Sequence, residues 1–202
     1  MPRPLSFAPD AALEAALRLF WSRGFEGTSV QDLVEATGLS RSSLYGTFGD
    51  KQSLYLAALE RYARRSGGAL YADLARSSAR EGITRHLRRI ADAGADDPEG
   101  LREDAPGDSA MGCFVVNASA ERAPHDAETH ARTAASRDGM LAAFEAAVRR
   151  AQTAGEIPAE RDARQLAALL TATAYGLRVL ARTRPPAEVL TRAAAAAVDA
   201  LG

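Results

Sequence analysis

The sequence has a single cysteine, a single lysine and no long run of apolar residues. Because Cys113 is the only cysteine, no disulfide can form within the chain, which fits a reducing compartment. No stretch approaches the roughly 18 to 20 continuous apolar residues of a membrane helix, and residues 1–10 contain no apolar run typical of a signal peptide. We therefore expect a cytoplasmic protein that has no membrane partner.

An excess of charge of one sign is also absent, since the formal net charge is −1 at pH 7. A protein that coats nucleic acid along its whole surface is strongly basic. Any DNA contact of this chain therefore has to be local. Lys51 is the only lysine among many arginines, which makes its position informative.

Motifs for catalysis or cofactor binding are missing as well. The sequence has no Gly-rich phosphate loop, no paired-carboxylate motif and no cluster of metal ligands, and its histidines are scattered at positions 86, 125 and 130. A nucleophilic cysteine needs a base within hydrogen-bond reach, and His125 lies beyond a proline, about three helical turns from Cys113. We expect no enzymatic activity, no cofactor and no metal.

Helical periodicity, by contrast, runs through nearly the whole chain. Apolar residues recur at three- and four-residue steps, alanine is abundant, and strand-like alternation is not sustained. The pattern predicts an all-α protein. Expected helices cover residues 10–23, 28–38, 40–48, 50–65, 82–94, 113–123, 126–153, 162–182 and 187–201, with a break at Gly67-Gly68, helical pattern resuming to Arg80, and a loop at 95–110.

The short segment from Ser40 to Phe48 is the most unusual of these helices. Only Leu44 and Phe48 are clear core anchors, so the helix has little stability by itself. It makes sense as the second helix of a helix-turn-helix, with the preceding helix as its apolar partner and Gly38 in the tight turn. Taken by itself, the segment is equally well explained as a solvated surface helix with serine caps.

Its remaining side chains suit contact with DNA. Arginine can reach guanine edges or phosphates, hydroxyls can bond phosphates or base edges, and a small residue lets a helix seat deeply in the major groove. These positions are Arg41, Ser42, Ser43, Tyr45, Gly46 and Thr47.

The surrounding residues resemble the DNA-binding domain of TetR-family regulators, without gaps, from Ala15 to Leu59. The matching segments are Leu19–Phe25, Gly27–Val30, Leu33–Ser40, Ser43–Tyr45, Phe48–Lys51 and Leu54–Tyr55. The resemblance implies DNA contacts at Thr28, Ser40, Arg41, Ser42, Ser43, Tyr45, Gly46, Thr47 and Lys51. Many relatives have His or Tyr at the place of Thr47 and a larger polar residue at Gly46, so here Thr47 has a shorter reach and Gly46 provides clearance.

Lys51 has independent support as a phosphate contact. It falls in the first turn of the expected fourth helix, where the helix dipole disfavours a cation. A phosphate bound at that helix N-terminus would satisfy both the free backbone N–H groups and the ammonium. The alternative is a solvated lysine.

The resemblance also implies a division of the chain and a dimer. Residues 6–66 would form the helix-turn-helix domain and residues 67–202 a helical ligand-binding and dimerisation domain, whose last two helices form a four-helix bundle with a second copy. The candidate apolar stripes are Leu166, Leu169, Leu170, Thr173, Leu177 and Leu180, followed by Val189, Leu190, Ala193, Ala194, Ala197 and Leu201. These stripes could instead face the core of a monomer.

An effector pocket is predicted around residues 111–126. Cys113, Asn117 and Glu121 are spaced one turn apart and share a helix face, and pockets are mostly apolar with few polar anchors. The candidate ligand-binding residues are Cys113, Phe114, Asn117, Glu121, Met140, Phe144 and Tyr175. Asn117 and Glu121 could also be buried structural hydrogen-bonding groups.

The sequence thus predicts a DNA-binding transcriptional regulator, a repressor that a small-molecule effector of unknown identity releases from its operator. One alternative is a repressor that responds to oxidants or electrophiles through Cys113, although a buried structural cysteine is the favoured interpretation of that residue. Another is a helical small-molecule-binding protein with vestigial DNA binding.

Overall fold

The computed structural model describes residues 8–75, 78–95 and 111–202, and within these ranges every regular element is a helix. The prediction of an all-α fold is confirmed. The helices are α1 (Ala8–Arg23), α2 (Val30–Thr37), α3 (Arg41–Phe48), α4 (Lys51–Leu74), α5 (Ala79–Ala95), α6 (Phe114–Glu121), α7 (Ala127–Thr153), α8 (Ala163–Ala181) and α9 (Ala187–Asp199).

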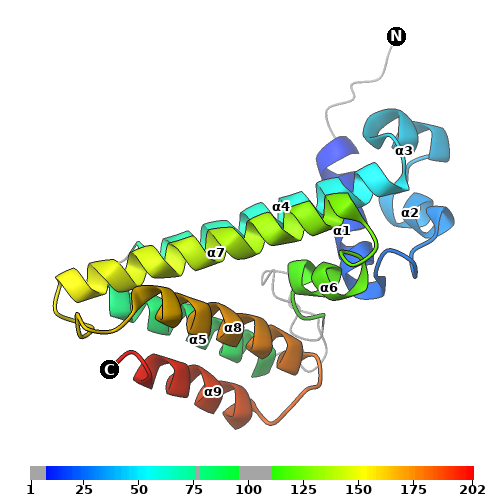
Figure 1. The fold of residues 1–202 in the computed structure, drawn as a ribbon. Coiled ribbons are helices and arrows are strands. Elements are labelled where there is room, and N and C mark those ends of the chain that lie inside the picture. Colours follow the sequence, from blue (N-terminus) through cyan, green and yellow to red (C-terminus); the bar gives the residue numbers. More distant parts are fainter. Residues whose placement is uncertain (1–7, 76–77, 96–110) are drawn as a thin grey trace.

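The molecule is elongated, with a small head built from α1, α2, α3 and the start of α4 at one end (Figure 1). Helices α4 and α7 pack side by side and both run away from the head, since Gln52 bonds Asp126 near their beginnings and Arg150 bonds the carbonyl of Leu74 near their ends. Helices α5 and α8 return beneath them, and α9 covers α5 and α8.

Two apolar clusters form the cores. The distal cluster lies among α4, α5, α7, α8 and α9, and the head cluster joins α1 to α4 with α6, including Cys113 and Phe114. Half-buried Tyr175 of α8 packs against both clusters. The predicted domain boundary at residues 66/67 falls within α4 and remains a prediction, but α6, which lies far beyond that boundary, packs with the head.

Three predicted features of helix α4 and its neighbours are wrong. Helix α4 continues through Gly67 and Gly68 to Leu74, and α5 already begins at Ala79 rather than at residue 82. Glycine costs about 1 kcal/mol in a helix, but buried Leu70 and Leu74 hold the last turns of α4 against the distal cluster. Helix α1 begins at Ala8 rather than at residue 10. Most of the predicted loop at 95–110 lies outside the described residues.

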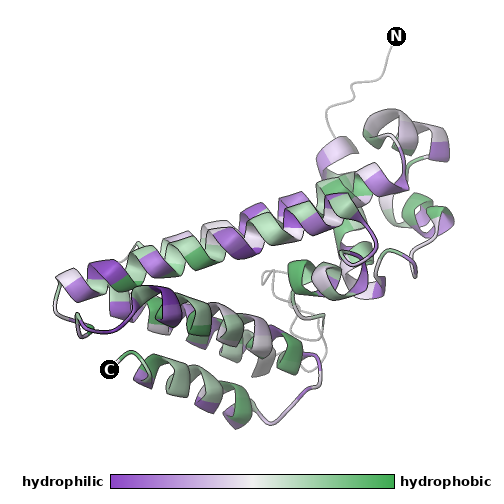
Figure 2. Cartoon of the chain, viewed as in Figure 1, coloured by the Kyte–Doolittle hydropathy of each residue, from purple (hydrophilic) through white to green (hydrophobic). Residues whose placement is uncertain are grey.

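The apolar stripes of α8 and α9 each divide between two environments. Leu177 is 1% exposed and Leu190 is 0% exposed, and both belong to the distal cluster of this chain. Leu169 and Leu180 are each 41% exposed and Val189 is 42% exposed. Figure 2 shows hydrophobic and hydrophilic residues on both helices. The predicted stripes therefore mix core residues with residues that are free to contact a second chain.

No helix in the described ranges has the combination of length and apolar content that crossing a membrane requires.

Candidate nucleic-acid interface

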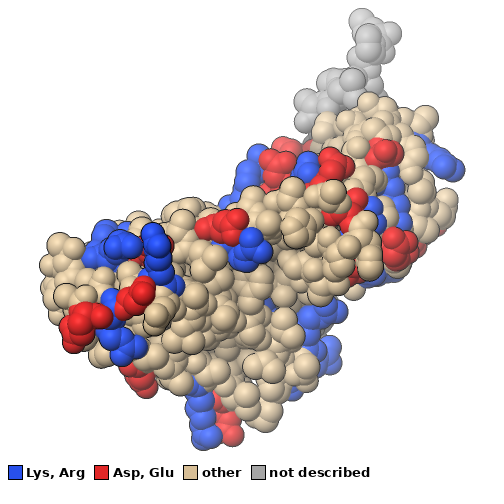
Figure 3. Space-filling view, viewed as in Figure 1, with Lys and Arg blue, Asp and Glu red and all other residues tan. Residues whose placement is uncertain are grey.

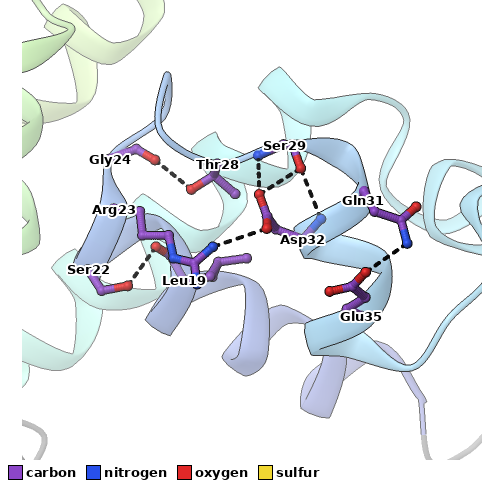
Figure 4. A network of polar contacts seen from close by, with 9 residues as sticks. All are labelled: Leu19, Ser22, Arg23, Gly24, Thr28, Ser29, Gln31, Asp32 and Glu35. Atoms are coloured by element: carbon purple, nitrogen blue, oxygen red, sulfur yellow. Dashed lines mark hydrogen bonds and ion pairs between the residues drawn. The ribbon is translucent and has the colours of Figure 1, made fainter.

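Helix α2 is fixed at its beginning by a reciprocal cap (Figure 4). The backbone N–H of Asp32 donates to Ser29 Oγ at 3.1 Å, and the backbone N–H of Ser29 donates to Asp32 Oδ2 at 2.7 Å. Each of these two N–H groups lacks a partner within the helix and finds one in the other residue's side chain. Arg23, at the end of α1, donates to Asp32 Oδ1 at 3.0 Å and ties the two helices together. Ser29 and Arg23 together keep the pKa of the exposed Asp32 carboxyl below its usual value.

The turn between α2 and α3 has the conformation that the sequence predicts. Gly38 has φ 68° and ψ 9°, in the left-handed region, and its N–H donates to the carbonyl of Val34 at 3.0 Å. Ser40 then caps α3 by accepting from the N–H of Ser43 at 3.2 Å. Local chemistry thus stops one helix and starts the next within a few residues, as a helix-turn-helix requires.

Helix α3 has one buried side and one open side. Leu44 is fully buried in the head cluster, and Phe48 packs partly against the same cluster. The exposed residues on the other side are Ser40, Arg41, Ser42, Ser43, Gly46 and Thr47. A Cβ atom at Gly46 would meet nothing within 4 Å, so this position faces open space.

The polar groups on the open side are partly used within the helix. Thr47 Oγ1 donates to the carbonyl of Ser43 at 2.9 Å, and Ser40 Oγ lies 3.0 Å from Ser42 Oγ. Each hydroxyl oxygen can still accept a bond, and the hydroxyl protons can reorient toward a phosphate. The Arg41 guanidinium lies 5.7 Å from the ring centroid of half-buried Tyr45, which keeps both side chains close to one surface.

Thr28, one of the predicted DNA contacts, has a buried side chain, and its contact with DNA stays a prediction. The side chain is 0% exposed, and Oγ1 donates to the carbonyl of Gly24 at 2.7 Å (Figure 4). The hydroxyl is therefore used to close the turn between α1 and α2. Thr28 supports the position of α2 from within.

Lys51 has a partner that the sequence did not reveal. It begins α4, as predicted, and its Nζ lies 4.2 Å from the ring centroid of Phe25. A cation over an aromatic face is stabilised by about 0.5–1 kcal/mol near a surface. The contact holds the half-buried ammonium beside the N-terminus of α4 and leaves its N–H donors available to a phosphate.

The charged side chains do not form a broad basic surface on the face shown in Figure 3. Lys and Arg alternate there with Asp and Glu over the whole length of the molecule. The mixture of charges on this face agrees with the low net charge.

The predicted effector residues divide between the two cores. Cys113 and Phe114 are buried in the head cluster, whereas Met140 and Phe144 are buried in the distal cluster. Tyr175 lies between the clusters, and burial raises the pKa of its hydroxyl. Neither of the two surface hollows described next contains all of these residues.

Two surface hollows are lined by candidate effector residues. A crevice of about 460 Å³ lies between α1, α6 and α8, and both Asn117 and Glu121 line it. A groove of about 540 Å³ lies between α4 and α7, with Met140 in its lining. Asn117 Nδ2 donates to the carbonyl of Met111 at 2.9 Å, and Glu121 accepts from the backbone of the head. Both residues thus make structural hydrogen bonds, although Asn117 is half-buried and Glu121 is exposed rather than buried.

Cys113 is a core residue in this structure. It is 3% exposed and stands at the N-cap of α6. It packs in the same cluster as Tyr62, and burial raises the pKa of the Tyr62 hydroxyl well above its usual value. A thiol packed in this way is shielded from an oxidant in solution.

Sequence reasoning missed His86 as a special residue. Its side chain is fully buried, Nδ1 lies 3.0 Å from Asp73 Oδ2, and Nε2 has no partner among the described residues. Burial lowers the pKa of His86 to about 4, so the ring is neutral at pH 7. The spacing of His86 from Ile83, Leu87 and Ile90 on one helix face was the signal that could have placed it in the core.

Comparisons with known proteins agree with this architecture. Residues 12–58 match the family model described as bacterial regulatory proteins, tetR family, and residues 105–197 match the tetracyclin repressor-like C-terminal domain. The HTH-type transcriptional repressor ComR of Escherichia coli K12 is 33% identical over 195 residues, which cover 95% of this chain and 88% of ComR. This chain belongs to the TetR family.

Further TetR-family relatives are similar over nearly the whole chain. The HTH-type regulator YezE of Bacillus subtilis 168 is 30% identical over 186 residues, which cover 90% of each protein. A cysteine mutant of the TetR family regulator CifR, solved in complex with 26-bp operator DNA, is 31% identical with a TM-score of 0.81 over all of both chains. A TetR regulator from Chloroflexus aurantiacus, 26% identical, has a TM-score of 0.80 and covers 94% of this chain and 91% of that one.

The relatives are transcriptional regulators and not enzymes. The TetR-family chain described here is accordingly a helix-turn-helix transcriptional regulator. Within its described residues, no group of His, Cys, Asp or Glu is arranged to hold a metal ion.

Proposed function

We propose that this protein is a homodimeric repressor that binds operator DNA through α3 and leaves it when a small-molecule effector binds. The open side of α3 carries the proposal, because Arg41 and the hydroxyls of Ser42, Ser43 and Thr47 all face solvent. Arginine and hydroxyl groups on a docked second helix can bond both base edges and phosphates. The solved operator complex of the relative CifR supports the same use of the fold.

The proposed DNA contacts are those on one surface of the head. Arg41 reads bases, Lys51 and Tyr45 hold phosphates, and Gly46 gives the helix clearance from the groove. Ser40, Ser42, Ser43 and Thr47 supply hydroxyls to the backbone or the base edges. The head of residues 6–66 would read DNA, and residues 67–202 would sense the effector and dimerise.

The exposed faces of α8 and α9 support the dimer. Leu169, Leu180 and Val189 are each more than two-fifths exposed, although large apolar side chains gain free energy from burial. Two copies joined there would present two α3 helices to half-sites about one DNA turn, or ~34–36 Å, apart.

The effector site is proposed within residues 67–202, with anchors among the residues predicted from the sequence. The crevice of about 460 Å³ and the groove of about 540 Å³, each lined by residues of this range together with residues of the head range, are both large enough for a small molecule. We expect a protein that works in the cytoplasm and has no catalytic activity.

Selection of bound sequences from a pool of random double-stranded DNA tests the proposal. The full chain should enrich an inverted repeat whose half-sites are about one helical turn apart. A matched selection with Arg41→Ala should enrich the repeat poorly or with a relaxed base at the position that Arg41 reads. If the unmodified chain enriches no sequence over the starting pool, the proposed function is wrong.

A further inference from the structure

The junction between α6 and α7 is bonded to the head at the turn that connects α1 to α2. Oε1 of Glu121 accepts hydrogen bonds from the backbone N–H of Phe25 at 2.9 Å and of Glu26 at 3.4 Å. These bonds join residues that are 96 and 95 positions apart in the sequence. The two N–H groups face outward from the turn after α1, and the carboxylate is the partner that satisfies them.

The approach of Glu121 to this turn is close. Gly24 has φ 76°, and a Cβ atom at this position would lie 2.6 Å from Glu121 Oε1. The left-handed conformation favours glycine at this position, and a Cβ atom there would require the Glu121 carboxylate to shift. Glu121 is exposed and also lines the crevice between α1, α6 and α8.

The neighbouring Arg122 makes a second set of contacts with the head. Its guanidinium lies 3.6 Å from the ring centroid of Phe25, and it donates to the side-chain oxygen of Gln52 in α4. It also forms ion pairs with Glu26 at 3.5 Å and with Asp126 at 3.6 Å. The Arg122 side chain is only 18% exposed, so these contacts are less screened than those of a free surface arginine. We name Glu121, Arg122 and the turn of residues 24–26 the latch.

The turn that the latch holds determines where α2 begins. The carbonyl of Gly24 accepts from Thr28 Oγ1 at 2.7 Å, and the carbonyl of Phe25 accepts from the N–H of Thr28 at 3.3 Å. Ser29, the N-cap of α2, follows directly. A shift of the turn is therefore transmitted through Thr28 to α2, and α2 packs against α3. Phe25 is also the ring over which Lys51 lies.

We propose that Glu121 and Arg122 are positioning residues for DNA recognition: they touch no DNA, and they set operator affinity by fixing the turn on which α2, α3 and Lys51 depend. The inference rests on the proposed function and adds specific residues to it. A dimer has to hold two heads at a fixed separation, and a loose head lowers affinity for the full repeat.

Two substitutions at Glu121 distinguish the loss of its hydrogen-bond acceptor from the loss of its negative charge. Glu121→Gln keeps an oxygen acceptor for the two N–H groups, whereas Glu121→Ala removes it. Glu160→Ala is the control, because Glu160 is exposed, lies between α7 and α8, and its substitution changes the net charge by the same amount. Loss of a negative charge alone favours binding to DNA. Weaker binding by Glu121→Ala would therefore oppose the general electrostatic effect.

Two measurements on the full chain are needed. Residue-resolved hydrogen exchange of the free protein should show the amides of Phe25 and Glu26 exchanging about tenfold faster in Glu121→Ala and at nearly the original rate in Glu121→Gln. Fluorescence anisotropy with the duplex enriched by selection should show about tenfold weaker binding for Glu121→Ala, and binding within about twofold of the unmodified chain for Glu121→Gln and Glu160→Ala.

The outcomes distinguish the two proposals. Unchanged exchange in Glu121→Ala would overturn the latch as a contact, and faster exchange with unchanged duplex affinity would overturn its positioning role. Equal weakening by Glu121→Gln and Glu121→Ala would show that an oxygen acceptor at residue 121 does not maintain duplex affinity, and would also overturn the role. Failure of the unmodified chain to bind any duplex would overturn the proposed function, and the exchange measurement would still report on the contact.

Discussion

The exposed side of α8 allows a matched pair of substitutions, Leu180→Glu and Leu177→Glu, that separates the dimer interface from the core. Leu180 is 41% exposed and Leu177 is 1% exposed, although they lie three residues apart on one helix. The same chemical change is thus made at a surface position and at a core position.

The Leu180→Glu substitution is expected to weaken dimerisation. Full burial of a leucine side chain contributes roughly 1.5–3 kcal/mol, and the exposed part of Leu180 accounts for about 1 kcal/mol of it. A carboxylate that loses water in an apolar interface costs at least about as much again. Since a twofold dimer contains the substitution twice, we expect about 4 kcal/mol in total, or roughly a thousandfold weaker dimerisation.

The Leu177→Glu substitution is expected to lower the free energy of unfolding. Truncation of a buried leucine to alanine already costs about 2–5 kcal/mol, and an unpaired carboxylate in the core costs more. Because domains are stable by only about 5–15 kcal/mol, Leu177→Glu should be unfolded or aggregated.

Sedimentation equilibrium over a range of concentrations, combined with circular dichroism, measures both effects. The unmodified chain should be a dimer at micromolar concentration, and Leu180→Glu should be a folded monomer. The reasoning is refuted if Leu180→Glu dimerises as tightly as the unmodified chain, or if Leu177→Glu remains folded with unchanged stability.

Other substitutions test the head and the distal core. Lys51→Ala should weaken duplex binding and lower the salt slope, measured by anisotropy at several salt concentrations, by about one unit; an unchanged slope would assign Lys51 only to its contact with Phe25. Gly46→Ala should raise the unfolding free energy in urea by about 0.5–1 kcal/mol, since the methyl group meets open space, yet weaken DNA binding by filling the clearance against the groove. Affinity equal to that of the unmodified chain would remove Gly46 from the interface. The pKa of folded His86 is lowered to about 4 from 6.5, so the unfolded chain binds the proton first as the pH falls. Stability should therefore drop between pH 6.5 and 4, by about 2 kcal/mol on going from pH 7 to pH 5. His86→Gln should lose this part of the pH dependence in urea titrations, whereas the exposed His125→Gln should keep it.

The head could be predicted from the sequence because its signals are local. Each signal lies within a few positions of the helix that it defines. These signals are the serine caps of α2 and α3, the left-handed Gly38 between them, and Leu44 as the buried residue of α3. Thr28 is the exception. A threonine hydroxyl can bond DNA, but only the folded turn shows that the hydroxyl of Thr28 donates to the carbonyl of Gly24.

The features that the sequence could not reveal depend on distant partners. Glu121 shares a helix face with Cys113, which suggested a pocket, but its partner is the backbone of residues 25 and 26. In the same way, helical periodicity identifies Leu177 and Leu180 as apolar without showing which of them faces the core. Packing of α4 against the distal cluster also overrides the local weakness of Gly67.

The central claim, that the open side of α3 reads DNA, is tested most directly by comparing Arg41→Ala with Arg88→Ala on the enriched duplex. Both arginines are exposed, and both substitutions change the net charge equally, but Arg88 lies on α5 in the distal part of the molecule. Anisotropy titrations should show at least about tenfold weaker binding for Arg41→Ala, a loss of about 1.4 kcal/mol or more, and unchanged binding for Arg88→Ala. Equal affinities for the two variants would contradict the assignment of α3 as the reading helix.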